Sequence, residues 1–421
     1  QQKSGLGGRQ QRQPDPKQLK DKLVAWDQVE SDQKSQLRIS TGLAEFDRVL
    51  GGREEAKGMV PGAVMLLGGE PGIGKSTILT QLVLAQLKTK LKRPIIYVSG
   101  EESPSQINLR IKRILEVEQK NNSKKKKQAS GQIGAQKQLK FVTSTDVDEI
   151  SALIKAEKPH LVVVDSVQAT TTQDLTGAPG SVGQVRESAD RLATVAKRLQ
   201  VPLFLVGHVT KDGTIAGPKT LEHIVDAVLE LSGERTGELR LLRTLKNRFG
   251  ATDEVGVFRV AEFGLEEVTN PSQYFLEHAE VAVPGSATCC VMEGTRPLLL
   301  EVQALVNKSQ LAMPRRVGRG LKISRIQVLA AVLQKHCRLP LGSHDIFLSA
   351  AGGYQVKEAG VDLGLALALT SSLKNKALPK QSVFIGEIGL LGEIRGVKYL
   401  ERRIKEAKRL GFQQVYSRQS H

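Results

Sequence analysis

Gly69-Glu70-Pro71-Gly72-Ile73-Gly74-Lys75-Ser76 is the stretch of sequence that decides the fold. It matches the phosphate-loop pattern, in which a glycine and four further residues precede Gly-Lys-Ser. The apolar run at 63–67 predicts a buried strand before the loop, and apolar residues at helical spacing predict a helix after it, from 76 to 87. In that context the glycines let backbone N–H groups and the helix N-terminus face phosphate oxygens. The sequence therefore predicts a nucleotide-binding site at the start of this helix.

The same motif predicts ATP and Mg²⁺ as cofactors. Lys75 is expected to reach the β and γ phosphates, and the hydroxyl of Ser76 is expected to bind Mg²⁺. The alternative is a glycine-rich turn with an accidental lysine. The residues expected to touch the nucleotide are Gly69, Glu70, Pro71, Gly72, Ile73, Gly74, Lys75, Ser76 and Thr77.

Two carboxylates follow apolar runs elsewhere in this part of the chain. Glu101 comes after the expected strand at 95–99, and Asp165 closes the one at 161–165. Ligands of open α/β sheets bind at the carboxyl ends of the strands. We therefore predict that Glu101 orients or deprotonates the attacking water and that Asp165 lies beside the metal. Glu102 is expected to cap the next helix, although the cap could instead be Glu101.

Three polar residues after strand ends are candidates for sensing the bound nucleotide. Ser166 and Gln168 follow Asp165, where a γ-phosphate sensor could lie. His208 follows the expected strand at 203–207 and could pass the nucleotide state to the next loop. A purely structural histidine is the alternative for His208.

The composition favours a polyanionic partner. The chain has 421 residues with 61 Lys and Arg against 44 Asp and Glu, which gives a formal net charge of +17. Nucleic acid is the leading candidate for such a charge, and solubilising lysines are the alternative. No apolar run is long enough to span a membrane, so no membrane partner is expected. The three cysteines form neither a metal pattern nor a disulfide framework, which favours a reducing compartment.

The chain divides into three regions by composition and periodicity. Residues 1–36 are polar and are predicted to be a flexible arm. Residues 37–271 alternate strand-like and helical patterns, which predicts an α/β domain with a mostly parallel sheet. A lysine-rich insert at 117–138 is predicted to be a solvated loop. Residues 272–421 are predicted to form a second, α+β domain.

Several polar or basic segments are candidates for contact with DNA. The loops at 170–182 and 210–220 lie beyond strand ends, and the segment at 313–322 is the most basic part of the second domain. Contacts with phosphates would fix position rather than read sequence. Ordinary solvated loops are the alternative. The cations predicted to contact DNA are Arg186, Lys211, Lys219, Arg315, Arg316, Arg319 and Lys322.

Taken together, these motifs resemble RecA-like ATPases and, more closely, the RadA (Sms) family of bacterial DNA-repair proteins. The string Lys246-Asn247-Arg248-Phe249-Gly250 carries the resemblance, with 38–42, 69–76 and 98–103 matching in the same order. The resemblance implies a RecA-like phosphate-loop core and a homo-hexameric ring that hydrolyses ATP. It also implies translocation on single-stranded and branched DNA, branch migration in recombination and repair, and a recombinase filament as partner. In such a ring Lys246 and Arg248 would act in the nucleotide site of the next subunit.

The second domain resembles the proteolytic domain of Lon. The stretch at 357–364, which corresponds to the segment of the Lon nucleophile, contains no serine, and Glu401 stands where Lon has its lysine. The resemblance therefore implies a non-proteolytic scaffold that binds DNA. Two alternatives to a motor stay open at this point: a nucleotide-gated DNA-binding ring without motor activity, and a Lon-type ATP-dependent protease, which the missing serine disfavours.

One departure concerns zinc. RadA proteins usually carry a four-cysteine zinc motif near the N-terminus, but no cysteine precedes Cys289 here. Zinc is therefore not expected in this chain, whether the sequence is shortened or this member lacks the module. The expected compartment is the cytoplasm of a bacterium, or an organelle if the source is eukaryotic.

Overall fold

The computed structural model describes residues 37–53, 56–121, 137–208, 218–233, 237–276 and 282–419. The predicted arm at 1–36, most of the insert at 117–138 and Lys211 lie outside these residues. Within the described residues, no helix is long and apolar enough to cross a membrane.

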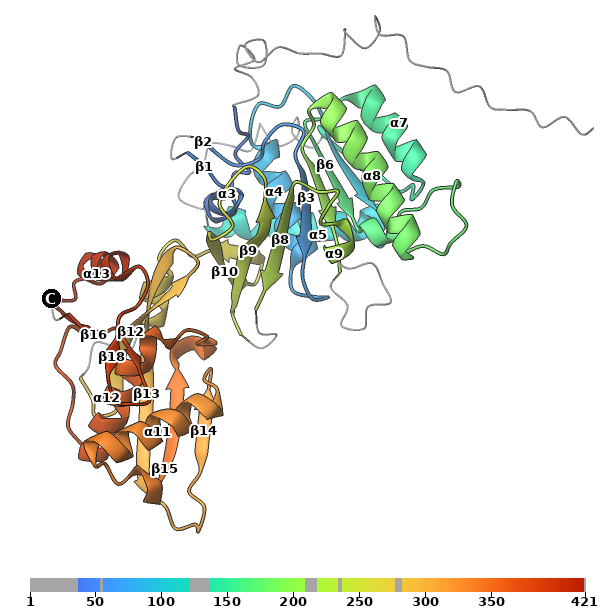
Figure 1. The fold of residues 1–421 in the computed structure, drawn as a ribbon. Helices are drawn as coiled ribbons and strands as arrows, with labels where there is room; N and C mark the ends of the chain where they lie inside the picture. The colour runs from blue at the N-terminus through green and yellow to red at the C-terminus, as the bar shows by residue number, and fades with distance from the viewer. Residues whose placement is uncertain are drawn as a thin grey trace, which may run out of the picture.

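A nine-stranded sheet forms the first unit (Figure 1), and six of its strands run parallel. The parallel strands, in spatial order, are β8 (Ala227–Ser232), β3 (Val64–Gly68), β7 (Leu203–Val206), β6 (Leu161–Asp165), β4 (Ile95–Ser99) and β5 (Leu139–Val142). The antiparallel strands β9 (Leu239–Asn247), β10 (Val255–Ala261) and β11 (Gly264–Glu267) extend the sheet beyond β8.

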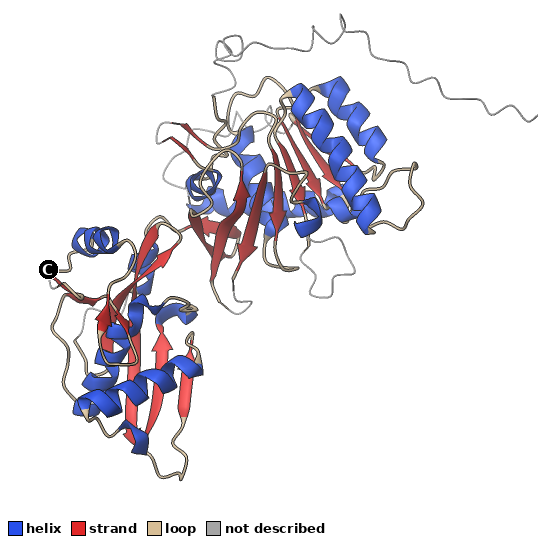
Figure 2. Ribbon diagram, in the orientation of Figure 1, coloured by secondary structure: helices blue, strands red, loops and turns tan. Residues whose placement is uncertain are grey.

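Helices cover both faces of this sheet because its central strands are apolar on both faces (Figure 2). In β6, Leu161 and Val163 pack with α3 (Ala44–Leu50), α4 (Lys75–Leu87) and α5 (Pro104–Asn121), while Val162 and Val164 pack with α7 (Val147–Glu157) and α8 (Val182–Leu199). The architecture confirms the predicted α/β fold with a RecA-like phosphate-loop core.

A six-stranded mixed sheet forms the second unit. Its strands, in spatial order, are β14 (Arg316–Arg319), β15 (His344–Ala350), β13 (Arg296–Lys308), β12 (Ser286–Glu293), β16 (Ser382–Phe384) and β19 (Gln414–Tyr416). Helices α11 (Ile323–Cys337) and α12 (Asp362–Lys374) pack on one core, and α13 (Leu400–Arg409) packs on another. The glycine-rich repeat at 386–396 forms a short hairpin of β17 (Glu387–Ile388) and β18 (Ile394–Arg395).

A buried ion pair anchors α13 to this sheet. Arg403 is 2% exposed, and its two terminal nitrogens lie 2.7 and 2.8 Å from the carboxylate oxygens of Glu358. Its Nε donates to the carbonyl of Lys398 at 3.1 Å, and Glu358 also accepts a bond from the backbone N–H of Met292 at 3.0 Å. Both carboxylate oxygens of Glu358 are engaged by Arg403, so removal of the arginine would leave a partly buried carboxylate without its partner.

We expect Arg403→Ala to lower the free energy of unfolding of this unit by about 3–5 kcal/mol, because the carboxylate of Glu358 would stay half-buried without its partner. Urea unfolding measures the loss. Arg402→Ala is the matched control. Arg402 is exposed, and among the described residues its guanidinium interacts with the ring of Tyr399, at 5.3 Å from the ring centroid. Its replacement should cost only about 0.5–1 kcal/mol. Equal losses in the two variants would contradict the buried-pair interpretation.

Candidate nucleotide site

The phosphate loop joins the end of β3 to the start of α4. Gly69 has φ +153°, and a Cβ there would lie 2.5 Å from the carbonyl oxygen of Leu231. Gly74 caps α4 in a left-handed conformation with φ +113°. Glycine is required at both positions, because side chains would clash with β8 or strain the turn. The backbone therefore curls into a compact loop at the N-terminus of a 13-residue helix.

Lys75 is held inside this loop. Its side chain is 4% exposed, and its Nζ donates to the carbonyls of Gly69 at 2.9 Å and Glu70 at 3.0 Å. Burial lowers the pKa of Lys75, while the nearby charges of Asp165 and Glu101 oppose that shift. The ammonium group is thus placed where the loop glycines would hold phosphate oxygens.

Asp165 and Ser76 supply neighbouring oxygen atoms beside the loop. Asp165 is 7% exposed at the end of β6, and its carboxylate accepts hydrogen bonds from Ser76 and from the hydroxyl of Tyr97, the latter at 2.9 Å. Burial raises the pKa of Asp165, and these two hydrogen bonds act in the opposite direction. A carboxylate and a hydroxyl are oxygen donors that suit Mg²⁺, so the residues present fit the predicted metal.

Glu101, Ser166 and His208 converge at the ends of three neighbouring strands. Ser166 donates a hydrogen bond to Oε1 of Glu101, and Nε2 of His208 lies 3.4 Å from the same oxygen. These residues follow β4, β6 and β7, which are adjacent in the sheet. The carboxylate of Glu101 therefore lies at the same edge as the phosphate loop, held by groups that can exchange hydrogen bonds with a water or a phosphate.

The predicted capping role of Glu102 is wrong. The carboxylate of Glu102 pairs with the guanidinium of Arg110 on α5. Ser103 caps the helix instead, since its hydroxyl accepts from the backbone N–H of Gln106 at 3.3 Å and Pro104 occupies the first helical position. Serine before proline is the stronger local capping signal, and sequence reasoning overlooked it.

Lys246 and Arg248 lie at the amino ends of the parallel strands, whereas the phosphate loop of their own chain lies at the carboxyl ends. Lys246 pairs with Val228 near the start of β8, and the backbone N–H of Arg248 bonds the carbonyl of Asp226, just before β8 begins. The phosphate loop instead follows the end of β3, which runs parallel to β8. Nζ of Lys246 donates to the carbonyl of Val225 at 3.0 Å, and Arg248 pairs with Asp226 at 3.1 Å.

Two residues that sequence reasoning missed join the phosphate loop and the helix after it to the antiparallel strands. Arg240 on β9 is buried, and its Nε donates to the carbonyl of Ile73 at 3.3 Å. Gln81 on α4 exchanges two 2.9 Å hydrogen bonds with the backbone of Leu265 on β11. Both contacts join segments more than 160 residues apart, so no local sequence pattern predicts them.

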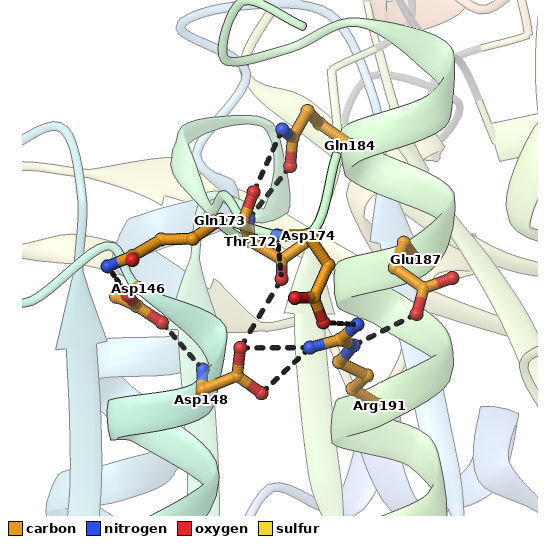
Figure 3. A network of polar contacts seen from close by, with 8 residues as sticks. All are labelled: Asp146, Asp148, Thr172, Gln173, Asp174, Gln184, Glu187 and Arg191. Atoms are coloured by element: carbon orange, nitrogen blue, oxygen red, sulfur yellow. Dashed lines mark hydrogen bonds and ion pairs between the residues drawn. The ribbon is translucent and has the colours of Figure 1, made fainter. Parts of the chain in front are cut away.

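A polar network holds the loop at 170–182 against α7 and α8 (Figure 3). Arg191 bonds both carboxylate oxygens of Asp148 at 2.9 Å and one oxygen of Asp174 at 2.6 Å. The buried Gln184 accepts from the backbone N–H of Thr172 at 2.8 Å and donates to its carbonyl at 3.1 Å. These hydrogen-bonded neighbours raise the pKa of Arg191. The first part of the loop is therefore fixed, which the sequence did not indicate.

The other predicted DNA-contacting cations differ in their availability. Arg186 on α8 and Lys219 on α9 (Pro218–Leu221) are exposed, as are Arg315, Arg319 and Lys322 around β14. Arg316 is different, because its guanidinium donates to the carbonyls of Arg315, His344 and Leu341 at 2.9, 2.6 and 2.8 Å. The guanidinium of Arg316 therefore ties β14 to the start of β15, and its contact with DNA stays a prediction.

The hydrogen bond from Tyr97 gives a pH-dependent prediction. If Asp165 binds the metal as predicted, hydrolysis of a nucleotide would need its carboxylate form, which is lost as pH falls through its raised pKa. Removing a donor to the charged form raises that pKa further. We expect Tyr97→Phe to shift the acid limb of the pH–rate profile to higher pH and to leave the rate at alkaline pH nearly unchanged. Steady-state ATP hydrolysis across pH measures this, and an unshifted acid limb would show that Asp165 does not control it.

The parallel sheet, the phosphate loop and the two carboxylates at its edge define a phosphate-loop ATPase with a RecA-like core. The family model described as "AAA domain" matches residues 48–214, and the model described as "Subunit ChlI of Mg-chelatase" matches residues 302–418.

Curated relatives named "DNA repair protein RadA" match most of this chain. The protein from Pseudomonas aeruginosa is 47% identical over 378 residues, which is 90% of this chain and 78% of the relative. Those from Synechocystis and Bacillus subtilis are 46% and 44% identical, and the matches cover 91% and 90% of this chain and 74% and 77% of the relatives. The chain belongs to the RadA family of DNA repair proteins, which confirms the resemblance, and is an ATP hydrolase of that class.

Proposed function

We propose that this chain is one subunit of a homo-hexameric, DNA-dependent ATPase. The ring would translocate on single-stranded and branched DNA and promote branch migration during homologous recombination and repair. The observation that carries this proposal is the position of Lys246 and Arg248. Both lie at the edge of the sheet opposite the phosphate loop of their own chain, so they can complete a nucleotide site only in a neighbouring subunit.

In the proposed mechanism each site draws on two subunits. The phosphate loop and Lys75 bind the phosphates, and Mg²⁺ held by Ser76 and Asp165 would neutralise their charge. Glu101 accepts the proton of the attacking water, with Ser166 and His208 orienting its carboxylate. Lys246 and Arg248 of the neighbouring subunit stabilise the charge of the transition state. Hydrolysis would then depend on subunit geometry, which is what coupling to movement requires.

The proposed DNA contacts are cations of both units. They comprise the exposed Arg186, Lys219, Arg315, Arg319 and Lys322, the partly buried Arg316, and Lys211, which lies outside the described residues. The second unit would act as a non-proteolytic, Lon-like scaffold of the ring. In the stretch at 357–364 that corresponds to the Lon nucleophile segment, Glu358 is engaged by Arg403, and no serine is present. By resemblance, a recombinase filament is the proposed protein partner, and the bacterial cytoplasm or an organelle the proposed compartment.

Strand displacement on a forked DNA duplex tests the motor function. The native chain with ATP and Mg²⁺ should release the labelled strand, whereas Lys75→Ala should bind the fork without releasing it. Release with ATP but not with a non-hydrolysable analogue would link the movement to hydrolysis. Tight binding without release by the native chain would instead support a nucleotide-gated scaffold, and cleavage of casein would support the protease.

A further inference from the structure

The strand end that carries Lys246 and Arg248 is held from two sides. The side chains of Lys246 and Arg248 bond Val225 and Asp226 on one side. Between them, Asn247 points the other way, and its Nδ2 donates to the carbonyl of Leu50 at 3.0 Å. This alternation is that of an extended chain. A contact that fixes the face of the strand bearing Asn247 therefore also sets the direction in which Lys246 and Arg248 project from the opposite face.

Arg38 fixes that side. Its NH1 donates to the carbonyls of Leu50, Gly51 and Gly58 at 3.2, 2.9 and 3.0 Å, and its NH2 donates to the carbonyl of Phe249. One guanidinium thus joins the end of α3, the strand pair at 52–57 and the strand end. No described carboxylate lies within ion-pair distance of it. Its charge acts on carbonyl groups, among them those at the negative end of a helix.

The backbones joined by Arg38 are in close contact. A Cβ on Gly51 would lie 3.5 Å from the Cα of Gly250, and a Cβ on Gly250 would lie 3.2 Å from the carbonyl oxygen of Leu50. Thr244 adds a hydrogen bond from its hydroxyl to the carbonyl of Val49 at 2.9 Å. The glycines permit this approach, but they do not fix its register. The planar guanidinium of Arg38, which bonds both backbones at once, can do so.

We propose that Arg38 is a positioning residue for ATP hydrolysis: it fixes the strand end so that Lys246 and Arg248 reach the nucleotide site of the neighbouring subunit. The inference rests on the proposed arrangement of sites between subunits. It gives a role to Arg38, the first residue of the Arg38-Ile39-Ser40-Thr41-Gly42 stretch, which precedes the phosphate loop in the sequence.

The first readout separates positioning from nucleotide binding. Arg38→Ala should lower kcat for ATP by about 10²-fold, as misplacement by about 1 Å can do, and leave KM for ATP unchanged. KM is spared because the phosphate loop lies at the other edge of the sheet. Thermal unfolding checks that the variant folds. If Arg38→Ala does not fold, the same measurement is made on Arg38→Gln, which keeps an amide donor.

The second readout is complementation between inactive subunits. A Lys75→Ala subunit has an inactive phosphate site but a correctly positioned strand end. An Arg38→Ala subunit has an intact phosphate site but a displaced strand end. In an equal mixture, about a quarter of the head-to-tail interfaces would join an intact site to an intact strand end, so activity should return. A mixture of Arg38→Ala with Lys246→Ala should stay inactive, because neither subunit supplies a working strand end.

A mixture of Lys75→Ala with Lys246→Ala separates this inference from the proposed function. If ATP hydrolysis returns in this mixture but not in the mixture of Lys75→Ala with Arg38→Ala, the proposed role of Arg38 is wrong, while the arrangement of sites between subunits stands. Failure of both mixtures would overturn the arrangement between subunits, and the inference with it. Native turnover by Arg38→Ala alone would also overturn the inference.

Discussion

Lys246→Ala is expected to abolish ATP turnover, with a loss in kcat of about 10³–10⁵-fold, while ATP still binds. The size of the effect is that of a cation inserted from a neighbouring subunit into a phosphoryl-transfer site. Binding should survive because Lys246 lies at the opposite edge of the sheet from the phosphate loop that holds the nucleotide. Steady-state hydrolysis measures turnover, and fluorescent ATP-analogue titration measures binding.

Lys308→Ala is the control for Lys246→Ala. Lys308 is an exposed lysine at the end of β13 in the second unit, so its removal changes the net charge equally without touching the site. Its turnover should equal that of the native chain. If Lys246→Ala hydrolyses ATP at the native rate, the sites are complete within single subunits and the arrangement proposed above is wrong.

Glu101→Gln is expected to lower kcat by about 10²–10⁴-fold, the usual contribution of a positioned general base. The amide keeps the shape of the side chain and can still accept from Ser166, but it cannot take a proton from water. ATP binding should therefore persist, and single-turnover measurements should show the defect in the chemical step.

Glu102→Gln is the matched control for Glu101→Gln, since the two acids are adjacent. Glu102 pairs with Arg110, whereas Ser166 and His208 contact Glu101. Replacement of Glu102 should therefore change kcat only a few-fold, roughly in line with loss of a partly exposed ion pair. A larger loss with Glu102→Gln than with Glu101→Gln would reverse the roles assigned to the two residues.

The elements that bear the phosphate site could be predicted because their signals are local. The strands at Ile95–Ser99 and Leu161–Asp165 were predicted to the residue, since continuous apolar runs that end in polar residues define parallel strands. The phosphate loop was predicted for a similar reason, as its glycines, lysine and serine are consecutive. The sequence placed Glu101, Ser166 and His208 after strand ends, but it did not predict that Ser166 and His208 contact the carboxylate of Glu101.

The parts that could not be predicted depend on contacts between distant segments. Arg240 supports the phosphate loop from β9, and Arg38 holds the strand end of Lys246 across more than 200 residues. Arg316 seemed to be a free cation because the sequence does not show the carbonyls of Leu341 and His344 that surround its guanidinium. In each case the partners of the arginine are backbone carbonyls, and the residue types in the sequence do not show which carbonyls will surround it.

The most direct test of the central claim is the rate of ATP hydrolysis by the native chain, measured with and without saturating single-stranded DNA. If the chain is a DNA-dependent ATPase whose sites lie between subunits, DNA should raise kcat, and the specific activity should rise with protein concentration as subunits assemble. A rate that depends on neither DNA nor protein concentration would contradict the account and leave only a phosphate-loop ATPase with sites complete in single subunits.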